Sequence, residues 1–174
     1  IMNKRILLLI VYSIIAVVAV TAKEPENWSL FKTANVVNYE FDFSTFKIDK
    51  VDAKDYIEMT QKIPYEKYKN STANILAQLA NEQLNKLDLK ISNDTISDFL
   101  LKVKPLTADD DGEHTFLFAL YYKPDQTLIE GFEINSNGGD GDSFVEEFLD
   151  GLKKTGRKLG KKIANIKETA ISLK

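Results

Sequence analysis

The feature that most constrains the fold is a change of hydrophobic period in the last third of the chain. Apolar and polar residues alternate over 99–104, residues 115–122 are apolar at nearly every position, and residues 127–134 return to a strand-like pattern. After residue 143 the apolar positions recur every three or four residues. Period two is typical of strands and period 3.6 of helices. The sequence therefore predicts a three-stranded meander, with 115–122 as the central strand, followed by a helix.

The C-terminal helix carries its own start signal. Ser143 and Glu146 fit the Ser-x-x-Glu capping box, in which the serine hydroxyl accepts from a free backbone N–H. Gly156 and Gly160 lie four residues apart on this helix, where each glycine costs about 1 kcal/mol relative to alanine. We expect these two and Gly151 to allow a close approach to the sheet, and a helix–helix seam in a dimer is the alternative. The predicted buried stripe consists of Phe144, Phe148, Leu152, Leu159 and Ile163.

The stretch from residue 35 to residue 87 predicts further strands and two helices. Strict alternation over 35–44 indicates a half-buried strand, and a change of apolar phase near Ser44 predicts a bulge or turn before a second segment. Asp52 begins a short helix, and a longer helix is expected over 71–87. The prediction is an α+β fold, an antiparallel β-meander sheet with helices packed on one face, in the order β(β)ααβββα. Residues 23–174 form one domain in this interpretation.

The first 22 residues have the layout of an export signal. Lys4 and Arg5 precede an apolar run over 6–20, and the segment ends in Val20-Thr21-Ala22, which suits a signal peptidase. The alternative is a retained membrane anchor, but a spanning helix needs about 20 apolar residues. We therefore predict a signal peptide over 1–22, an exported protein in the periplasm or outside the cell, and no permanent membrane anchor after cleavage.

Composition narrows the possible functions. The chain has no cysteine, which excludes disulfides and a lipid-bearing cysteine, so an exported domain must be held by its core. Residues 23–150 carry 13 Lys and Arg against 25 Asp and Glu, whereas residues 151–174 carry eight against one. The net charge of residues 23–174 is therefore −12 plus +7, or −5, and no interleaved aromatic pattern accompanies the basic residues. Nucleic-acid binding is not expected.

Acidic residues before the C-terminal helix are weak candidates for calcium binding. Asp140, Asp142 and Glu146 offer carboxylate oxygens, with 109–111 as a second acidic turn. A calcium loop requires a glutamate at its twelfth position, which counted from Asp140 is Gly151. Solvated turn residues are the favoured interpretation, and no cofactor is predicted.

The C-terminal helix also has a basic face beside its apolar one. Such a face is typical of a helix that contacts an anionic surface, but a solvated face near an acidic body is the favoured interpretation. Both interpretations stay open at the level of sequence. The basic residues are Lys153, Lys154, Arg157, Lys158, Lys161 and Lys162.

Catalytic patterns are scarce. There is no thiol nucleophile, and the one histidine, His114, has no serine or aspartate motif tied to it. Paired carboxylates across a cleft remain a way to hydrolyse a glycosidic bond. The leading hypothesis is a non-catalytic binding or assembly module of the cell envelope, a monomer or weak dimer, with an envelope protein or cell-wall component as partner. A carbohydrate-active or other hydrolase is the alternative.

The last third of the chain resembles known exported domains. The stretch Thr127-Leu128-Ile129-Glu130-Gly131-Phe132-Glu133-Ile134, the turn Asn137-Gly138-Gly139 and the helix after Phe144 are similar to the ending of small exported bacterial α+β domains of unknown function. Those are similar in layout to the curli-secretion lipoprotein and to the amino-terminal domain of the Tol translocation protein. The resemblance implies an envelope module that acts through protein contacts, and this chain lacks the acylated cysteine of the lipoprotein members.

Export makes a direct prediction about the mature protein. Cleavage after Ala22 leaves Lys23 as the first residue, because the apolar run is too short to anchor the chain. Intact mass spectrometry of the protein recovered from its native envelope measures this. A protein that keeps residues 6–20 and fractionates with membranes would contradict the prediction.

Overall fold

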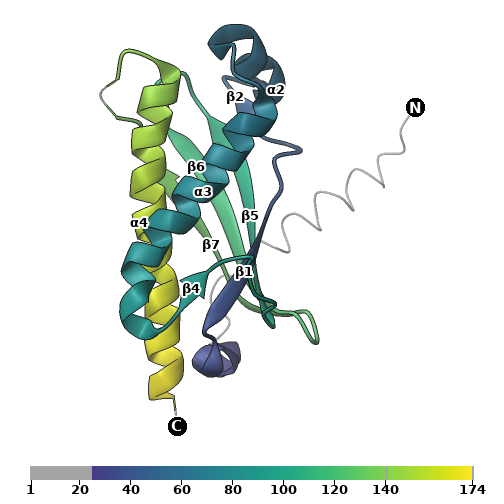
Figure 1. Ribbon diagram of the computed structural model, residues 1–174, viewed down its shortest axis with the longest axis vertical. Coiled ribbons are helices and arrows are strands. Elements are labelled where there is room, and N and C mark those ends of the chain that lie inside the picture. The colour runs from purple at the N-terminus through teal and green to yellow at the C-terminus, as the bar shows by residue number, and fades with distance from the viewer. Residues whose placement is uncertain (1–24, 140, 174) are drawn as a thin grey trace, which may run out of the picture.

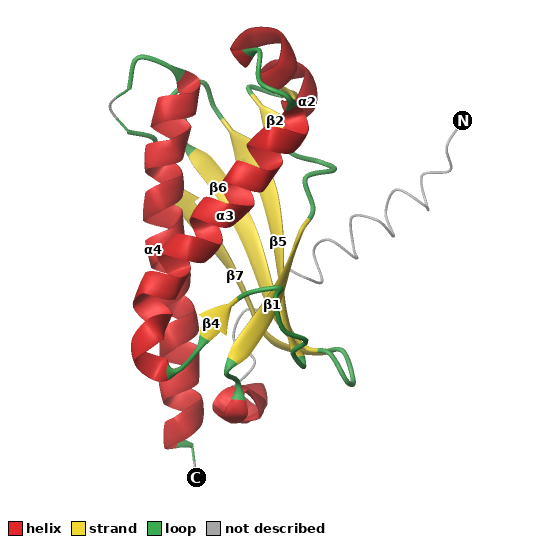
Figure 2. Ribbon diagram, viewed as in Figure 1, coloured by secondary structure: helices red, strands yellow, loops and turns green. Residues whose placement is uncertain are grey.

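The computed structural model describes residues 25–139 and 141–173, so the predicted signal peptide and Asp140 lie outside the described residues. A twisted sheet forms one layer, and the long helices α3 and α4 form a second layer across one of its faces (Figures 1 and 2). This confirms the predicted α+β class.

In chain order the elements are the 3₁₀ helix η1 (Pro25–Thr33), β1 (Val36–Phe41), β2 (Lys47–Ile48), β3 (Val51–Asp52), α2 (Ala53–Tyr56), the π-helix η2 (Ile57–Gln61), α3 (Tyr65–Leu84), the 3₁₀ helix η3 (Asn85–Leu87), β4 (Lys90–Ile91), β5 (Phe99–Ala108), β6 (His114–Tyr122), β7 (Thr127–Ser136) and α4 (Phe144–Ser172).

The sheet is mixed, which corrects the predicted antiparallel sheet. Strands β5, β6 and β7 form the expected antiparallel meander, with β6 in the middle. However, β1 and β2 both pair in parallel with β5, and β4 pairs in parallel with β1. The reason is the helical segment between β1 and β5, which carries the chain back so that β5 runs in the same direction as β1. The predicted order also missed the two-residue strands β3 and β4.

The interruption predicted near Ser44 is present. Strand β1 ends at Phe41, Ser44 and Thr45 form a turn, and pairing with β5 resumes at Lys47, opposite Thr107. The two segments therefore lie end to end along one edge of β5. The change of apolar phase in the sequence reports this break in the ladder.

Helix α4 is capped and buried as the sequence indicates. The Ser143 hydroxyl accepts a hydrogen bond from the Glu146 amide at 3.4 Å. Phe148 is fully buried, and its ring centroid lies 5.5 Å from that of Tyr68 on α3 and 4.8 Å from that of His114 on β6. It therefore joins both helices to the sheet. All five residues of the predicted stripe are buried, namely Phe144, Phe148, Leu152, Leu159 and Ile163.

Two of the glycines of α4, Gly156 and Gly160, serve a different contact from the expected one, whereas a Cβ on Gly151 would lie 2.8 Å from the ring of His114 on β6, in line with the expected approach to the sheet. A Cβ on Gly156 would lie 2.8 Å from the Leu79 Cβ, and one on Gly160 would lie 2.5 Å from the Ala80 carbonyl oxygen. Both neighbours belong to α3, so the close approach is between the two helices and not to the sheet. The sequence prediction was wrong for these two because a small residue signals that something is near without saying what. Figure 2 shows α3 crossing α4 obliquely over this stretch.

We predict that Gly160→Ala destabilises the protein although alanine is the better helix former. The new methyl group meets the backbone of Ala80, which cannot rotate away, and overpacking of this kind costs about 1–3 kcal/mol. Urea unfolding monitored by circular dichroism measures the change. Lys161→Ala, one residue along and exposed, is the control and should stay within about 0.5 kcal/mol. An unchanged or raised midpoint for Gly160→Ala would show that the helices separate freely.

Candidate functional site

The face of the sheet opposite α3 and α4 carries no helix within the described part of the chain (Figure 2). Along β5 the alternating positions Leu101 and Val103 are buried toward the helices, whereas Lys102 lies on the opposite side and is exposed. On β6 the corresponding positions, such as Leu117, are only half-buried. The strand predicted to be apolar on both faces is therefore central, but only one of its faces is covered. We call the other the open face.

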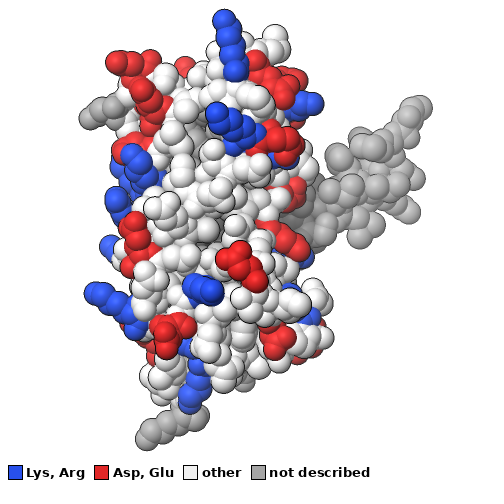
Figure 3. Space-filling view, in the orientation of Figure 1, with Lys and Arg blue, Asp and Glu red and all other residues white. Residues whose placement is uncertain are grey.

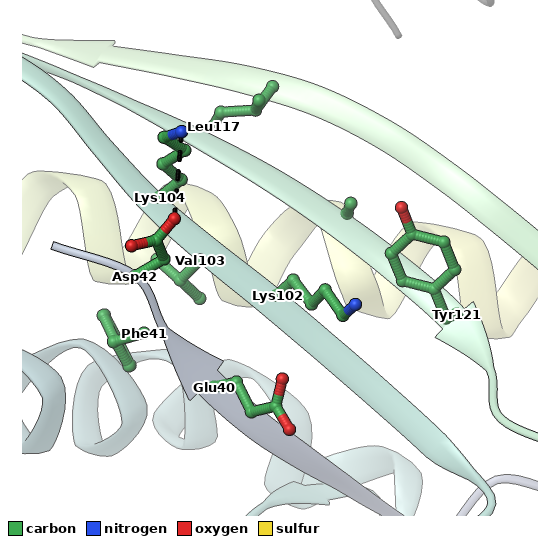
Figure 4. A pocket seen from close by; sticks show the side chains of 9 residues that line it. Glu40, Phe41, Asp42, Lys102, Val103, Lys104, Leu117 and Tyr121 are labelled. Atoms are coloured by element: carbon green, nitrogen blue, oxygen red, sulfur yellow. Dashed lines mark ion pairs between the residues drawn. The ribbon is translucent and has the colours of Figure 1, made fainter. Parts of the chain in front are cut away.

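A hollow of about 550 Å³ lies on the open face. Figure 4 shows that its side chains come from three neighbouring strands, β1, β5 and β6, and from the residue that follows β1. It is lined by Glu40, Phe41, Asp42, Lys102, Val103, Lys104, Leu117, Ala119 and Tyr121.

Strand register decides which of these residues are neighbours. Glu40 on β1 pairs with Lys102 on β5, and Lys102 pairs with Ala119 on β6. Ala119 in turn pairs with Gly131 on β7. The row across the sheet therefore begins with two long charged side chains and ends with two small residues. We call Ala119 and Gly131 the floor of the hollow. The Lys102 ammonium lies 5.2 Å from the centroid of the Tyr121 ring, at the edge of this floor.

One carboxylate of the hollow is firmly held in its ionised form. Asp42 accepts a hydrogen bond from the Ser44 amide at 2.9 Å and forms an ion pair with Lys104 at 3.8 Å. The hydrogen bonds from Ser44, and then the charge of Lys104, lower the pKa of Asp42 below its usual value. A glycosidase acid needs the opposite shift. Asp42 is thus suited to accept hydrogen bonds from a ligand.

The six basic residues predicted to share one face of α4 do not form one surface. Lys158 donates to the Asn135 carbonyl oxygen at 2.6 Å, and Lys162 forms an ion pair with Glu130 at 3.2 Å. Lys154, one turn earlier, donates to the turn that follows β7. These three lysines face β7, whose outer edge pairs with no other strand among the described residues. Lys158 occupies a backbone carbonyl of this strand, and unpaired backbone groups on an edge strand can otherwise pair with another strand.

The other three basic residues point away from the sheet. Lys153, Arg157 and Lys161 are exposed and lie four residues apart on α4. Lys153 has a partner in Asp150, at 3.6 Å. The predicted anionic-surface contact is therefore reduced to a single row along the helix.

The candidate calcium ligands take a local role at the start of α4. A carboxylate oxygen of Glu146 accepts from the Asp142 amide at 3.1 Å, which completes the cap of the helix. Asp140 lies outside the described residues. Within residues 25–139 and 141–173, no group of three or more histidine or acidic side chains is placed to hold a metal ion.

A buried polar chain centred on His114 was missed at the level of sequence. Its Nδ1 lies 2.9 Å from the Gly112 carbonyl oxygen, and its Nε2 lies 2.8 Å from the Thr155 hydroxyl. The hydroxyls of Thr155 and Ser136 share a further hydrogen bond of 2.8 Å. The three side chains are at most 2% exposed, so no substrate reaches them. This row of hydrogen-bonded side chains is therefore structural. Strand register pairs His114 with Ser136, and the packing of α4 on the sheet brings Thr155 to both.

Comparisons with known proteins find only distant likenesses among solved structures. No protein-family description matches the chain, and no curated protein matches it in sequence. One similar solved structure is an uncharacterized protein, 15% identical, covering 78% of this chain and 92% of its own, with a TM-score of 0.42. Another is a putative lipoprotein from Caulobacter crescentus CB15, 7% identical, covering 59% and 85%, with a TM-score of 0.36.

These likenesses are too distant to carry an argument about function. The similarity to the curli-secretion and Tol proteins stays a prediction. Among the described helices, none combines the length and the apolar composition that crossing a membrane requires.

His114 gives the fold a specific pH dependence. Burial, the largest effect, lowers the pKa of His114 below its usual value of 6.5, and the charges of Lys158 and Lys154 act in the same direction against Asp109 and the Gly112 carbonyl. His114 therefore becomes protonated near pH 6.5 in the unfolded chain but only at a lower pH in the folded chain. Stability should be complete above pH 6.5 and fall as the pH drops below it, with a slope approaching about 1.4 kcal/mol per pH unit.

The measurement is urea unfolding at a series of pH values between 7.5 and about 5, above the range in which Asp42 and Asp125 titrate. In His114→Gln the slope over this window should flatten, whatever the variant's absolute stability. An equal slope in both proteins would mean that His114 protonates freely in the folded state.

Proposed function

We propose that this protein is a non-catalytic binding module of the bacterial cell envelope and that the open face of its sheet is the binding surface. The observation that carries the proposal is the hollow over β1, β5 and β6, where charged side chains surround an apolar floor that no described element covers. The envelope location rests on the export signal predicted over 1–22.

The open face differs from an ordinary solvated sheet face. Antiparallel sheets with one face in water usually present polar residues there. Here Leu100, Leu117 and Tyr121 lie on this face, and all three are half-buried. A contiguous apolar area rimmed by charged residues is typical of an interaction site.

The alternative hydrolase function draws on one observation, the presence of Glu40 and Asp42 in the same hollow. The two carboxylates stand two positions apart along one stretch of chain, so they share one side of the hollow. Hydrolysis of a glycosidic bond uses carboxyl groups on both sides of the bond, one of them with a raised pKa. The lowered pKa of Asp42 favours binding.

Binding to the native envelope tests the surface with a matched pair of variants. The double change Lys102→Ala and Lys104→Ala removes two positive charges from the open face, and Lys153→Ala with Arg157→Ala removes two from the outer row of α4. We expect the fraction that sediments with isolated envelopes to fall about tenfold for the first pair, which corresponds to about 1.4 kcal/mol of binding free energy. For the second pair we expect the fraction to stay unchanged.

The reverse ranking would place the site on α4 and favour contact with an anionic surface. Release of soluble sugars or peptides from the same envelopes, abolished by Glu40→Gln, would contradict the non-catalytic assignment. The unfolding midpoints of the two double variants, measured alongside, separate loss of binding from loss of folding. Each substitution is at an exposed or half-exposed position, so the midpoints should change little.

A further inference from the structure

We propose that the ligand of the open face is a segment of a neutral glycan chain, with one sugar ring lying on Tyr121. This inference rests on the proposed function and specifies the chemistry of its ligand. It is carried by the charge balance of the hollow, by its one lining tyrosine and by the shape of its floor.

The charges that line the hollow cancel. Two carboxylates, Glu40 and Asp42, stand on one side, and two ammonium groups, Lys102 and Lys104, lie in the adjacent row. A strongly anionic or cationic ligand would be attracted by one row and repelled by the other. A neutral ligand rich in hydroxyls suits both rows, because each hydroxyl both donates to a carboxylate and accepts from an ammonium group.

The arrangement of these groups is also that of a hydrogen-bonding surface with free capacity. Asp42 uses its oxygens for the Ser44 amide and Lys104, which fixes its position. Lys102 lies beside the Tyr121 ring and forms no ion pair within 4 Å among the described residues. Its ammonium group therefore retains hydrogens to donate toward a ligand above the floor.

Tyr121 offers the apolar half of such a site. Figure 4 shows the ring on the open face with the Lys102 side chain reaching toward it, and the Lys102 ammonium lies over the ring, 5.2 Å from its centroid. The C–H groups of a pyranose ring form an apolar surface of similar size, and burying it against an aromatic ring is favourable while the hydroxyls remain at the rim.

The floor leaves room for a ring that lies flat. Ala119 and Gly131 face each other across β6 and β7 next to Tyr121, and neither projects beyond a methyl group. The hollow of about 550 Å³ is open on one side, which suits a chain crossing the sheet better than a single small molecule enclosed in a pocket.

The test is a titration of the isotope-labelled protein with three neutral probes, chitotetraose, cellotetraose and maltotetraose, followed by NMR. We expect at least one probe to shift backbone amides of β5 and β6 around Lys102 and Ala119, with dissociation constants in the millimolar range or tighter. Tyr121→Leu, which keeps an apolar side chain but loses the flat ring, should weaken that binding about tenfold. Lys161→Gln on α4 is the control and should leave it unchanged.

The outcomes separate this proposal from the one it rests on. Absence of shifts with all three probes, in a protein that still sediments with envelopes through Lys102 and Lys104, overturns the glycan and leaves the binding surface in place. Concentration-dependent dimerisation lost in the Lys102→Ala and Lys104→Ala protein would then identify a second copy as the occupant. If the wild-type protein shows neither the amide shifts nor binding to envelopes, both proposals are overturned. Shifts confined to α4 also overturn the glycan site.

Discussion

The close crossing of α3 and α4 is the contact on which the rest of the structure depends. Gly156 and Gly160 let the backbones of the two helices approach, with Leu79 and Ala80 against them. The helices can then lie together over one face of the sheet, and Phe148 closes the space beneath them. With the helices concentrated on that side, the apolar residues of the opposite face have no cover from the described chain. The candidate site is thus a consequence of how the core is closed.

Electrostatics in this molecule works through local pairs and not through a single charged surface. The acidic body and the basic C-terminal segment meet in the ion pair of Lys162 with Glu130, and Lys154 and Lys158 donate to backbone carbonyls of β7 and of the turn after it. These contacts consume half of the basic face and occupy part of a strand edge. The charges of the open face are balanced within three neighbouring strands. A net charge or a helical wheel alone would have suggested a different binding surface.

Much of the fold could be predicted because period and capping are local. Ser143 caps α4, the five apolar residues of its stripe are buried, and the break at Ser44 separates β1 from β2. The direction of β1 relative to β5 was wrong, because alternation is the same in parallel and antiparallel strands. The hollow could not be predicted either, since its residues come from strands up to about eighty positions apart. No spacing in the sequence links Glu40 to Ala119.

The sequence by itself determined the class of the fold, the middle strand of the meander, the capped amphipathic helix and the absence of cysteine chemistry. These depend on neighbours within a few residues, where the backbone geometry of a helix or strand already fixes which side chains share a face. Only the tertiary structure decided which face of the sheet is covered, which lysines are occupied and where the polar chain of His114 runs. Those depend on strand register and helix crossing, which are set by the fit of many distant side chains at once.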